Sequence, residues 1–154
     1  MPLLRAALSW NFVLATAICA SLLAQLIKVL LNLFIFHRFI AERMWGAGGM
    51  PSSHSATVCA MVVATGRYCG VNSPLFAIAA VLSIIVMYDA MGVRYETGEQ
   101  AKVLNRMFTE WMDQGFEQFQ LPHGKKLKEM VGHTPIEVVT GAALGIVLGF
   151  AMPM

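Results

Sequence analysis

Long apolar runs alternate with short polar stretches along the chain. A helix needs about 20 mostly apolar residues to cross a bilayer, and the apolar runs approach this length. The pattern predicts an all-α fold, an integral membrane bundle of about four transmembrane helices within one membrane domain, residues 1–154. The expected spans are residues 8–36, 55–70, 74–91 and 136–152.

The only long polar region, residues 92–134, separates the third run from the fourth. Between residues 99 and 119, apolar side chains return every three or four positions, which is typical of an amphipathic helix. This helix could lie in the plane of the membrane interface or could cap the bundle as a soluble helix. The apolar positions are Ala101, Leu104, Phe108 and Trp111.

Small residues recur at every fourth position in two of the expected spans. The fourth span has Gly141, Gly145 and Gly149, and the second has Ala56, Ala60 and Ala64. Such stripes allow helices to approach closely in lipid, where hydrophobicity does not drive them together. We expect them to serve packing within the chain, or the contact of a homodimer.

Composition supports a membrane protein and excludes other classes. Charged residues make up 13% of the chain, against about 25% in soluble domains. A net charge of +2 gives no basis for nucleic-acid binding. The apolar run after Arg5 continues without a polar cleavage region, which favours a retained first span over a signal peptide. Three cysteines without metal-ligand spacing, Cys19, Cys59 and Cys69, are interpreted as packing residues.

The basic residues predict the orientation of this multi-pass protein. With four spans, the first and third connections share one side of the membrane and carry eight basic residues. The other side carries Arg5 and Arg67. Loops rich in Lys and Arg stay in the cytoplasm, so the eight are expected there. They are Arg38, Arg43, Arg94, Lys102, Arg106, Lys125, Lys126 and Lys128.

Four groups of polar residues fall at the ends of spans that this topology brings to the cytoplasmic face. Ionisable side chains within spans are costly and need a partner or a function, and Lys28 and Asp89 are the two that most need one. The groups are Gln25 with Lys28, Pro51-Ser52-Ser53-His54, Asp89 with Arg94, and His133 with Glu137.

Each of these residues also has a purely structural interpretation. Ser52 or Ser53 is a natural helix N-cap, and Asp89 and Arg94 can neutralise each other. Thr134-Pro135-Ile136-Glu137 has the pattern of a capping box with proline at the first helical position. These interpretations stay open beside the functional one.

The functional interpretation is a phosphate site. Helix N-termini offer free N–H donors and partial positive charge to an anion. Lys28 and Arg94 would add full charges, and the Ser53 hydroxyl would add a donor. A histidine held by a carboxylate can attack phosphorus while a second histidine protonates the leaving oxygen. This chemistry requires no metal or other cofactor.

Three blocks of sequence carry a specific resemblance. Gly48-Gly49-Met50-Pro51-Ser52-Ser53-His54-Ser55-Ala56, Tyr88-Asp89-Ala90-Met91-Gly92-Val93-Arg94 and Gly132-His133-Thr134-Pro135-Ile136-Glu137-Val138 occur in this order. They resemble the divergent branch of the type-2 phosphatidic acid phosphatase superfamily, which also includes the vanadium haloperoxidases. The resemblance extends from Gln25 to the last span and implies a phosphate site on membrane helices.

The superfamily motifs map onto this chain one residue at a time. Lys28 resembles the first-motif lysine, although no Arg-Pro follows it. Ser52 and His54 match the second-motif serine and general-acid histidine, with Ser53 in place of glycine. Arg94 resembles the third-motif arginine, but Val93 precedes it where serine is usual. His133 matches the nucleophile, and Glu137 stands at the aspartate position.

The spacing within the third motif differs from the superfamily pattern. Residues 95–132 separate Arg94 from His133, a far longer interval than the superfamily has. Lys128 lies close to the expected spacing and could take over the role of the arginine.

Together, these observations predict a membrane phosphatase that hydrolyses a phosphate monoester or diphosphate on a lipid. His133 is the expected nucleophile, Glu137 orients it, and His54 is the acid. The expected phosphate ligands are Lys28, Ser52, Ser53 and Arg94, with Asp89 and Lys128 in support.

Two other interpretations of the same residues remain. The first is a non-catalytic membrane module that binds phospholipid headgroups or a partner protein through the same pocket. The second is a metal site built from Asp89, Glu99, His133 and Glu137.

Overall fold

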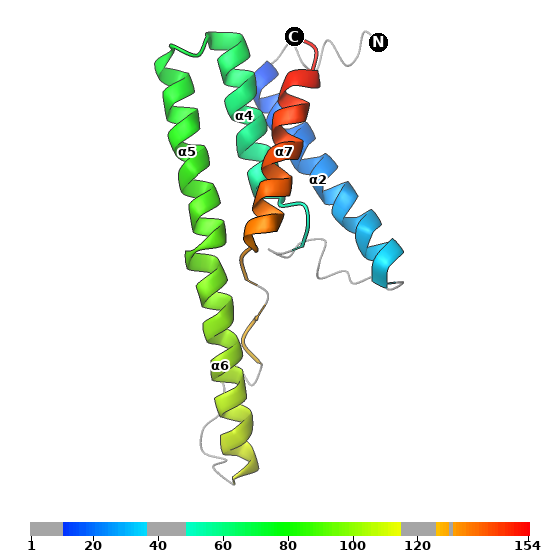
Figure 1. The fold of residues 1–154 in the computed structure, drawn as a ribbon, viewed down its shortest axis with the longest axis vertical. Helices are drawn as coiled ribbons and strands as arrows, with labels where there is room; N and C mark the ends of the chain where they lie inside the picture. Colours follow the sequence, from blue (N-terminus) through cyan, green and yellow to red (C-terminus); the bar gives the residue numbers. More distant parts are fainter. Residues whose placement is uncertain (1–10, 37–48, 115–125, 130) are drawn as a thin grey trace.

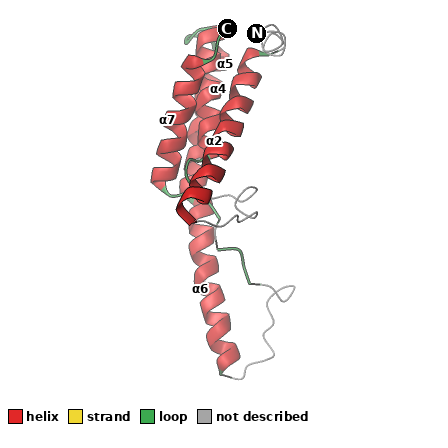
Figure 2. Ribbon diagram, turned by 90° about the vertical axis from the view of Figure 1, so that its right-hand side faces the viewer, coloured by secondary structure: helices red, strands yellow, loops and turns green. Residues whose placement is uncertain are grey.

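All regular elements in the described part of the chain are helices, which confirms the all-α prediction. The computed structural model describes residues 11–36, 49–114, 126–129 and 131–154. Helices α4, α5 and α7 run side by side, and α2 leans away from them toward its C-terminal end (Figures 1 and 2). The helices are α2 (Phe12–Phe36), α4 (Ser53–Cys69), α5 (Pro74–Met91), α6 (Val93–Asp113) and α7 (Pro135–Ala151).

Short polar side chains mark where the helices begin. The Ser52 hydroxyl accepts a hydrogen bond from the Ser55 amide at the start of α4 (3.3 Å), and the Ser73 hydroxyl accepts one from the Phe76 amide in α5 (3.2 Å). Both satisfy N–H groups that have no partner within their helix. Proline occupies the first position of α5 and α7, where its missing N–H costs nothing.

The core consists of small side chains, so the helix backbones lie close together. Ala20 and Ala24 of α2 pack against Ala56 and Ala60 of α4, and all four are fully buried. A Cβ added to Gly145 of α7 would collide with the Ala56 carbonyl oxygen. The two stripes of small residues therefore face each other within one chain, which is the first of the two uses expected for them.

Large apolar side chains cover the outside of the bundle. On α5, Leu75, Ile78, Val81, Ile84 and Ile85 are each more than half exposed. A soluble monomer rarely leaves such a continuous apolar face in water, whereas the hydrocarbon of a bilayer suits it. This surface fits the helical membrane bundle that the sequence predicts.

Two helical stretches among the described residues are long and apolar enough to cross a membrane. They are Phe12–Phe34 and the stretch Pro74–Asp113, and α7 is apolar but shorter. A helix occupies the described part of each segment that the sequence marks as a span, to within one or two residues. Residues 8–10 of the first segment lie outside the described residues. The number of membrane crossings stays a prediction.

The polar connection contains the expected amphipathic helix, but it begins earlier than the sequence suggests. Helix α6 starts at Val93, directly after α5, and continues in nearly the same direction beyond the end of the bundle (Figure 1). It therefore neither lies across the bundle as a cap nor runs perpendicular to α5. The last residues of the predicted helix, 115–119, lie outside the described residues.

Candidate functional site

The N-terminal ends of α4 and α7 meet at one end of the bundle. The Ser52 amide donates to the Glu137 carbonyl oxygen (2.9 Å), and Gly141 lies so close that a Cβ there would collide with the Ser52 backbone. Ser52 is fully buried, and its hydroxyl pairs with the Ser55 hydroxyl at 3.1 Å. Two helix N-termini thus share one small region, where their N–H groups favour an anion.

His133 lies at this junction, immediately before α7. Its ring is buried, and its Nδ1 lies 3.2 Å from Glu137 Oε2. The same carboxylate oxygen accepts a hydrogen bond from the Thr134 amide (3.0 Å), which is the expected capping contact. The carboxylate therefore has both roles that the sequence left open, helix cap and histidine partner.

The second ring nitrogen of His133, Nε2, is buried. Nε2 has no hydrogen-bond partner among the described residues. A buried polar atom without a partner is rare and costs stability. With Nδ1 donating to Glu137, Nε2 carries the lone pair of the neutral imidazole.

His54 lies beside His133 in an edge-to-face arrangement. The two ring centroids are 5.8 Å apart. His54 is exposed, because it stands on the outer side of the first turn of α4. The sequence predicted two histidines on one face, and the structure brings them together.

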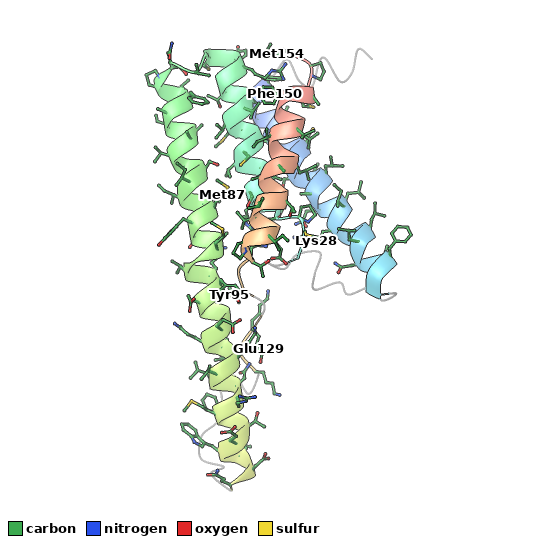
Figure 3. The ribbon with its side chains drawn as sticks, viewed as in Figure 1. Lys28, Met87, Tyr95, Glu129, Phe150 and Met154 are labelled. Atoms are coloured by element: carbon green, nitrogen blue, oxygen red, sulfur yellow. The ribbon has the colours of Figure 1, made fainter. Side chains whose placement is uncertain are left out.

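Lys28 reaches this group from α2. Only 2% of its surface is exposed, and its side chain passes Gly49, where an added Cβ would lie 3.4 Å from Lys28 Cδ. Its charge interacts with His54, His133 and Glu137. Figure 3 shows Lys28 beside the N-terminal end of α7. One turn earlier on α2, Gln25 carries a buried Oε1 that has no hydrogen-bond partner among the described residues.

Arg94 and Asp89 form an ion pair at the junction of α5 and α6. Arg94 Nε lies 2.6 Å from Asp89 Oδ2, and both side chains are partly exposed. Both charges act on His54, so the pair lies at the border of the site. This contact is the neutralising pair that the structural interpretation expected.

The long interval between Arg94 and His133 closes on itself in space. Gly132 packs so tightly on α6 that an added Cβ would meet the Tyr95 amide nitrogen and, at 2.6 Å, the Arg94 carbonyl carbon. The His133 amide donates to the Ala90 carbonyl oxygen at 3.0 Å. The chain leaves the site along α6 and returns to it, so Arg94 and His133 are neighbours despite their separation in sequence.

The structure does not bring Lys128 to the site. Its neighbour Leu127 is bound to Asn105 of α6, 11 residues beyond Arg94 and thus about 16 Å along the helix. Figure 3 shows Glu129 beside α6, far from Lys28. The suggestion that Lys128 replaces the arginine has no support from this geometry.

The proposed metal ligands are not assembled either. Glu99 lies on α6 and pairs with Lys102. Within the described ranges, no three His, Cys, Asp or Glu side chains are grouped as metal ligands. The arrangement at His133 is instead one histidine pair, one carboxylate and one lysine.

The environment of His133 favours its neutral form. Burial lowers its pKa below the usual 6.5, the hydrogen bond and charge of Glu137 raise it, and the charges of Lys28 and His54 lower it; the net shift is downward. At neutral pH the ring is therefore uncharged and Nε2 can act as a nucleophile.

Fold and site together define a helical membrane protein with a histidine, carboxylate and lysine group at the junction of two helix N-termini. The chain belongs to the family described as the divergent PAP2 family, whose model matches residues 9–148. This confirms the resemblance read from the three sequence blocks.

A relative from Bacillus subtilis (strain 168) covers nearly the same length. It is named uncharacterized membrane protein YuiD, and it is 39% identical over 144 residues, which cover 90% of this chain and 91% of the relative. Its name supports membrane association and specifies no reaction. No solved structure matches the chain.

The sequence interpretation missed the backbone partner of His133. The Ala90 carbonyl binds the His133 amide at the point where Gly92 interrupts the helix between α5 and α6. Gly92 marks this break in the sequence, but nothing local to it indicates which distant residue uses the carbonyl.

Proposed function

We propose that this protein hydrolyses a phosphate monoester or diphosphate on a membrane lipid through a phosphohistidine intermediate. One observation carries the proposal: His133 has Nδ1 on the Glu137 carboxylate and a buried Nε2 without a partner among the described residues. A histidine nucleophile requires this arrangement, because the carboxylate stabilises the cation that forms as Nε2 attacks.

In the first step, His133 Nε2 bonds to the terminal phosphorus, and the bond from this phosphorus to the leaving oxygen breaks. The leaving oxygen is the ester oxygen of a monoester or the bridging oxygen of a diphosphate. His54, whose pKa is held below the usual 6.5 by burial and by the charges of Arg94 and Lys28, reacts in its protonated form and gives its proton to the leaving oxygen. In the second step, water attacks phosphorus, His54 takes a proton from it, and the phosphorus–nitrogen bond breaks. Inorganic phosphate leaves and both histidines return to their initial states.

Three features favour binding of the phosphoryl group at this place. The N-termini of α4 and α7 meet there, and Lys28 contributes a buried positive charge. Ser52, Ser53 and Arg94 are the further proposed ligands, and Asp89 holds the Arg94 guanidinium near His54. Arg94 would turn from Asp89 toward the phosphoryl oxygens when substrate binds.

Family membership supports phosphatase-like chemistry, and the apolar surroundings support a lipid substrate. On α2, the residues after Lys28 include exposed Leu30, Leu33 and Phe34, so apolar surface continues past the level of the site. A lipid can therefore keep its tail in the membrane while its phosphate reaches Lys28. We propose a multi-pass topology with this site on the cytoplasmic side.

The decisive experiment is phosphate release from a panel of lipid phosphates by the purified protein, with and without a chelator. Phosphatidic acid, phosphatidylglycerol phosphate and a polyprenyl phosphate and diphosphate cover the chemical range. His133→Ala should abolish turnover and leave substrate binding largely intact, because it removes an interaction made only in the transition state. His123→Ala is the matched control, since it removes a histidine that has no assigned role.

Each result separates the candidate functions. Release that survives chelation and disappears in His133→Ala supports the proposal. An acid-labile, base-stable phosphoprotein that is trapped during turnover and absent in His133→Ala would identify the intermediate. Binding of lipid phosphates without any release would favour the non-catalytic module, and undiminished turnover in His133→Ala would reject the histidine mechanism.

The proposed acid has a separate test. His54→Ala should slow turnover by about 10²–10⁴-fold, and least for substrates with good leaving groups, because a general acid matters most when the leaving oxygen is basic. Rates for alkyl and aryl phosphate esters in both proteins would measure this difference. An equal loss for all leaving groups would assign His54 to phosphate binding instead.

A further inference from the structure

A short extended segment returns the chain from the far part of α6 to the site. We call residues 126–129 and 131–133 the strap. Leu127 of the strap lies beside Asn105 of α6. Further along, Glu129 and Val131 lie beside Gly98, and Gly132 lies beside Tyr95. The strap therefore runs antiparallel to α6, and its last residue is His133.

Asn105 binds the far end of the strap with its whole amide group. Its Oδ1 accepts from the Leu127 amide (2.9 Å), and its Nδ2 donates to the Leu127 carbonyl (2.9 Å) and to Glu129 Oε1 (2.8 Å). Asn105 is only 4% exposed. A buried side-chain amide whose oxygen and nitrogen are both hydrogen-bonded fixes the position and the register of the segment it binds.

Two glycines allow the strap to lie directly on α6. A Cβ at Gly98 would lie 2.6 Å from the Glu129 carbonyl oxygen, and Gly132 has φ +95° and no space for a Cβ. Backbone therefore contacts backbone from Gly98 to Tyr95. The His133 amide then binds the Ala90 carbonyl oxygen, which completes the path.

From these contacts we infer that Asn105 is a positioning residue for His133. It lies 12 residues after the start of α6, about 18 Å along the helix, and acts through the strap rather than by contact with substrate. The inference rests on the proposed function. It also explains how a long insertion before the nucleophile is compatible with catalysis, because the strap follows α6 back to the site.

The first test is Asn105→Ala, with Thr109→Val as its matched control. Thr109 is one turn further along α6, and its hydroxyl donates to the Asn105 carbonyl of the same helix. Asn105→Ala should lower kcat about 100-fold, since displacing a reactive group by about 1 Å has this effect. KM should stay within about twofold, because the phosphate ligands are not on the strap. Thr109→Val should leave both constants unchanged.

A second pair of variants separates positioning from general destabilisation. Asn105→Asp loses both amide donors and places a carboxylate against Glu129. Adding Glu129→Gln exchanges the amide and the carboxylate between the two positions and restores a hydrogen bond between them. The double variant should recover about tenfold of the kcat lost in Asn105→Asp. No recovery, with equal unfolding temperatures in the single and double variants, would overturn the inference.

A third measurement does not depend on turnover. In protein with isotope-labelled histidine, the His133 imidazole signals are those absent from His133→Ala, and their pH titration reports the surroundings of the ring. The charged groups facing it are Glu137 of α7, Lys28 of α2 and His54 of α4. Asn105→Ala should move these signals and raise the pKa of His133 toward its usual value as burial is lost, and Thr109→Val should not.

This measurement keeps the two proposals distinguishable. If wild-type protein releases no phosphate from any lipid, the proposed function fails, and the His133 signals still decide whether Asn105 positions the ring. Unmoved His133 signals in Asn105→Ala would overturn the inference, whether or not turnover can be measured.

Discussion

At the scale of single residues, Glu137 combines two contacts that can be separated chemically. Its Oε2 accepts from the Thr134 amide at the start of α7 and lies 3.2 Å from His133 Nδ1. A glutamine at this position can still cap the helix through its side-chain oxygen. It cannot stabilise a positively charged imidazole by charge, so the two roles give different outcomes.

We therefore expect Glu137→Gln to fold normally and to turn over much more slowly. Its unfolding temperature in detergent should lie within a few degrees of wild type, and kcat should fall by about 10²-fold or more, since the variant loses transition-state stabilisation. Circular dichroism melts and lipid phosphatase assays would measure both. A variant that unfolds at low temperature yet retains wild-type kcat would show that Glu137 is only a cap.

The pH dependence follows from the environment of His133. Attack requires the neutral ring, and burial brings the pKa of His133 below 6.5 even though Glu137 raises it. As the pH is lowered, kcat/KM should therefore reach half of its maximum at a pH below 6.5, the point where an ordinary histidine is half protonated. In Glu137→Gln the raising contribution is gone, so the acid limb should move to lower pH. A limb that moves to higher pH would contradict this electrostatic account.

At the scale of elements, the contact between α4 and α7 carries the site. Gly141 and Gly145 let α7 lie against the backbone of α4 at Ser52 and Ala56. In lipid, close packing of this kind is a main source of helix association. The same contact fixes the two helix N-termini beside each other, so packing and site geometry depend on one another.

Gly145→Ala should therefore destabilise the bundle by about 1–3 kcal/mol, the range typical of overpacking. The added methyl group would collide with the Ala56 carbonyl, which belongs to the backbone and cannot rotate away. Ala143→Val is the control, because residue 143 is exposed on the opposite side of α7. Unfolding by denaturing detergent would compare them, and equal stability of both variants would contradict the close contact.

The sequence predicted those parts of the elements that depend on local patterns. Apolar runs located the helices, Ser52 or Ser53 and Thr134 marked two starts, and Gly145 belongs to a stripe whose partner stripe contains Ala56. The position of α6 depends instead on whether Gly92 bends the chain, and no periodicity reveals that. The strap could not be predicted from the sequence either, because Asn105 and Leu127 pair across 22 residues without a repeating pattern.

The sequence predicted which residues form the candidate site better than it predicted the path of the chain between them. Lys28, His54, His133 and Glu137 come together as expected. Lys28 lies in the C-terminal half of α2, the other three lie at helix starts, and adjacent helices alternate in direction. Lys128 was suggested from linear spacing alone, and that spacing has no meaning once the chain follows α6 outward and returns. Spacing in the sequence does not indicate spatial proximity where the chain leaves the site and returns to it.

At the scale of the whole molecule, charge and apolar surface are segregated along the long axis. Among the described residues, five basic side chains lie on α6 and the strap, and the opposite end of the bundle holds Arg67. Arg67 donates to the carbonyl oxygens of Gly149 and Met152 and so caps the end of α7. The five are Arg94, Lys102, Arg106, Lys126 and Lys128.

This segregation predicts the orientation in the membrane. Because basic residues are retained in the cytoplasm, α6 and the strap should project into the cytoplasm, and the connection between α4 and α5 should face outward. Single cysteines at Lys126 and Asn72, both exposed, would report the two sides in protein whose Cys19, Cys59 and Cys69 are replaced by alanine.

A membrane-impermeant maleimide applied to intact cells should label Asn72→Cys readily and Lys126→Cys only after permeabilisation. Labelling of both after permeabilisation is the internal control for reactivity. The reverse pattern in intact cells would place His133 and Lys28 on the outer side. The substrate would then have to be a lipid phosphate of the outer leaflet, while the chemistry proposed for His133 would be unchanged, because it depends on the contact of α4 with α7 and not on the direction in which α6 points.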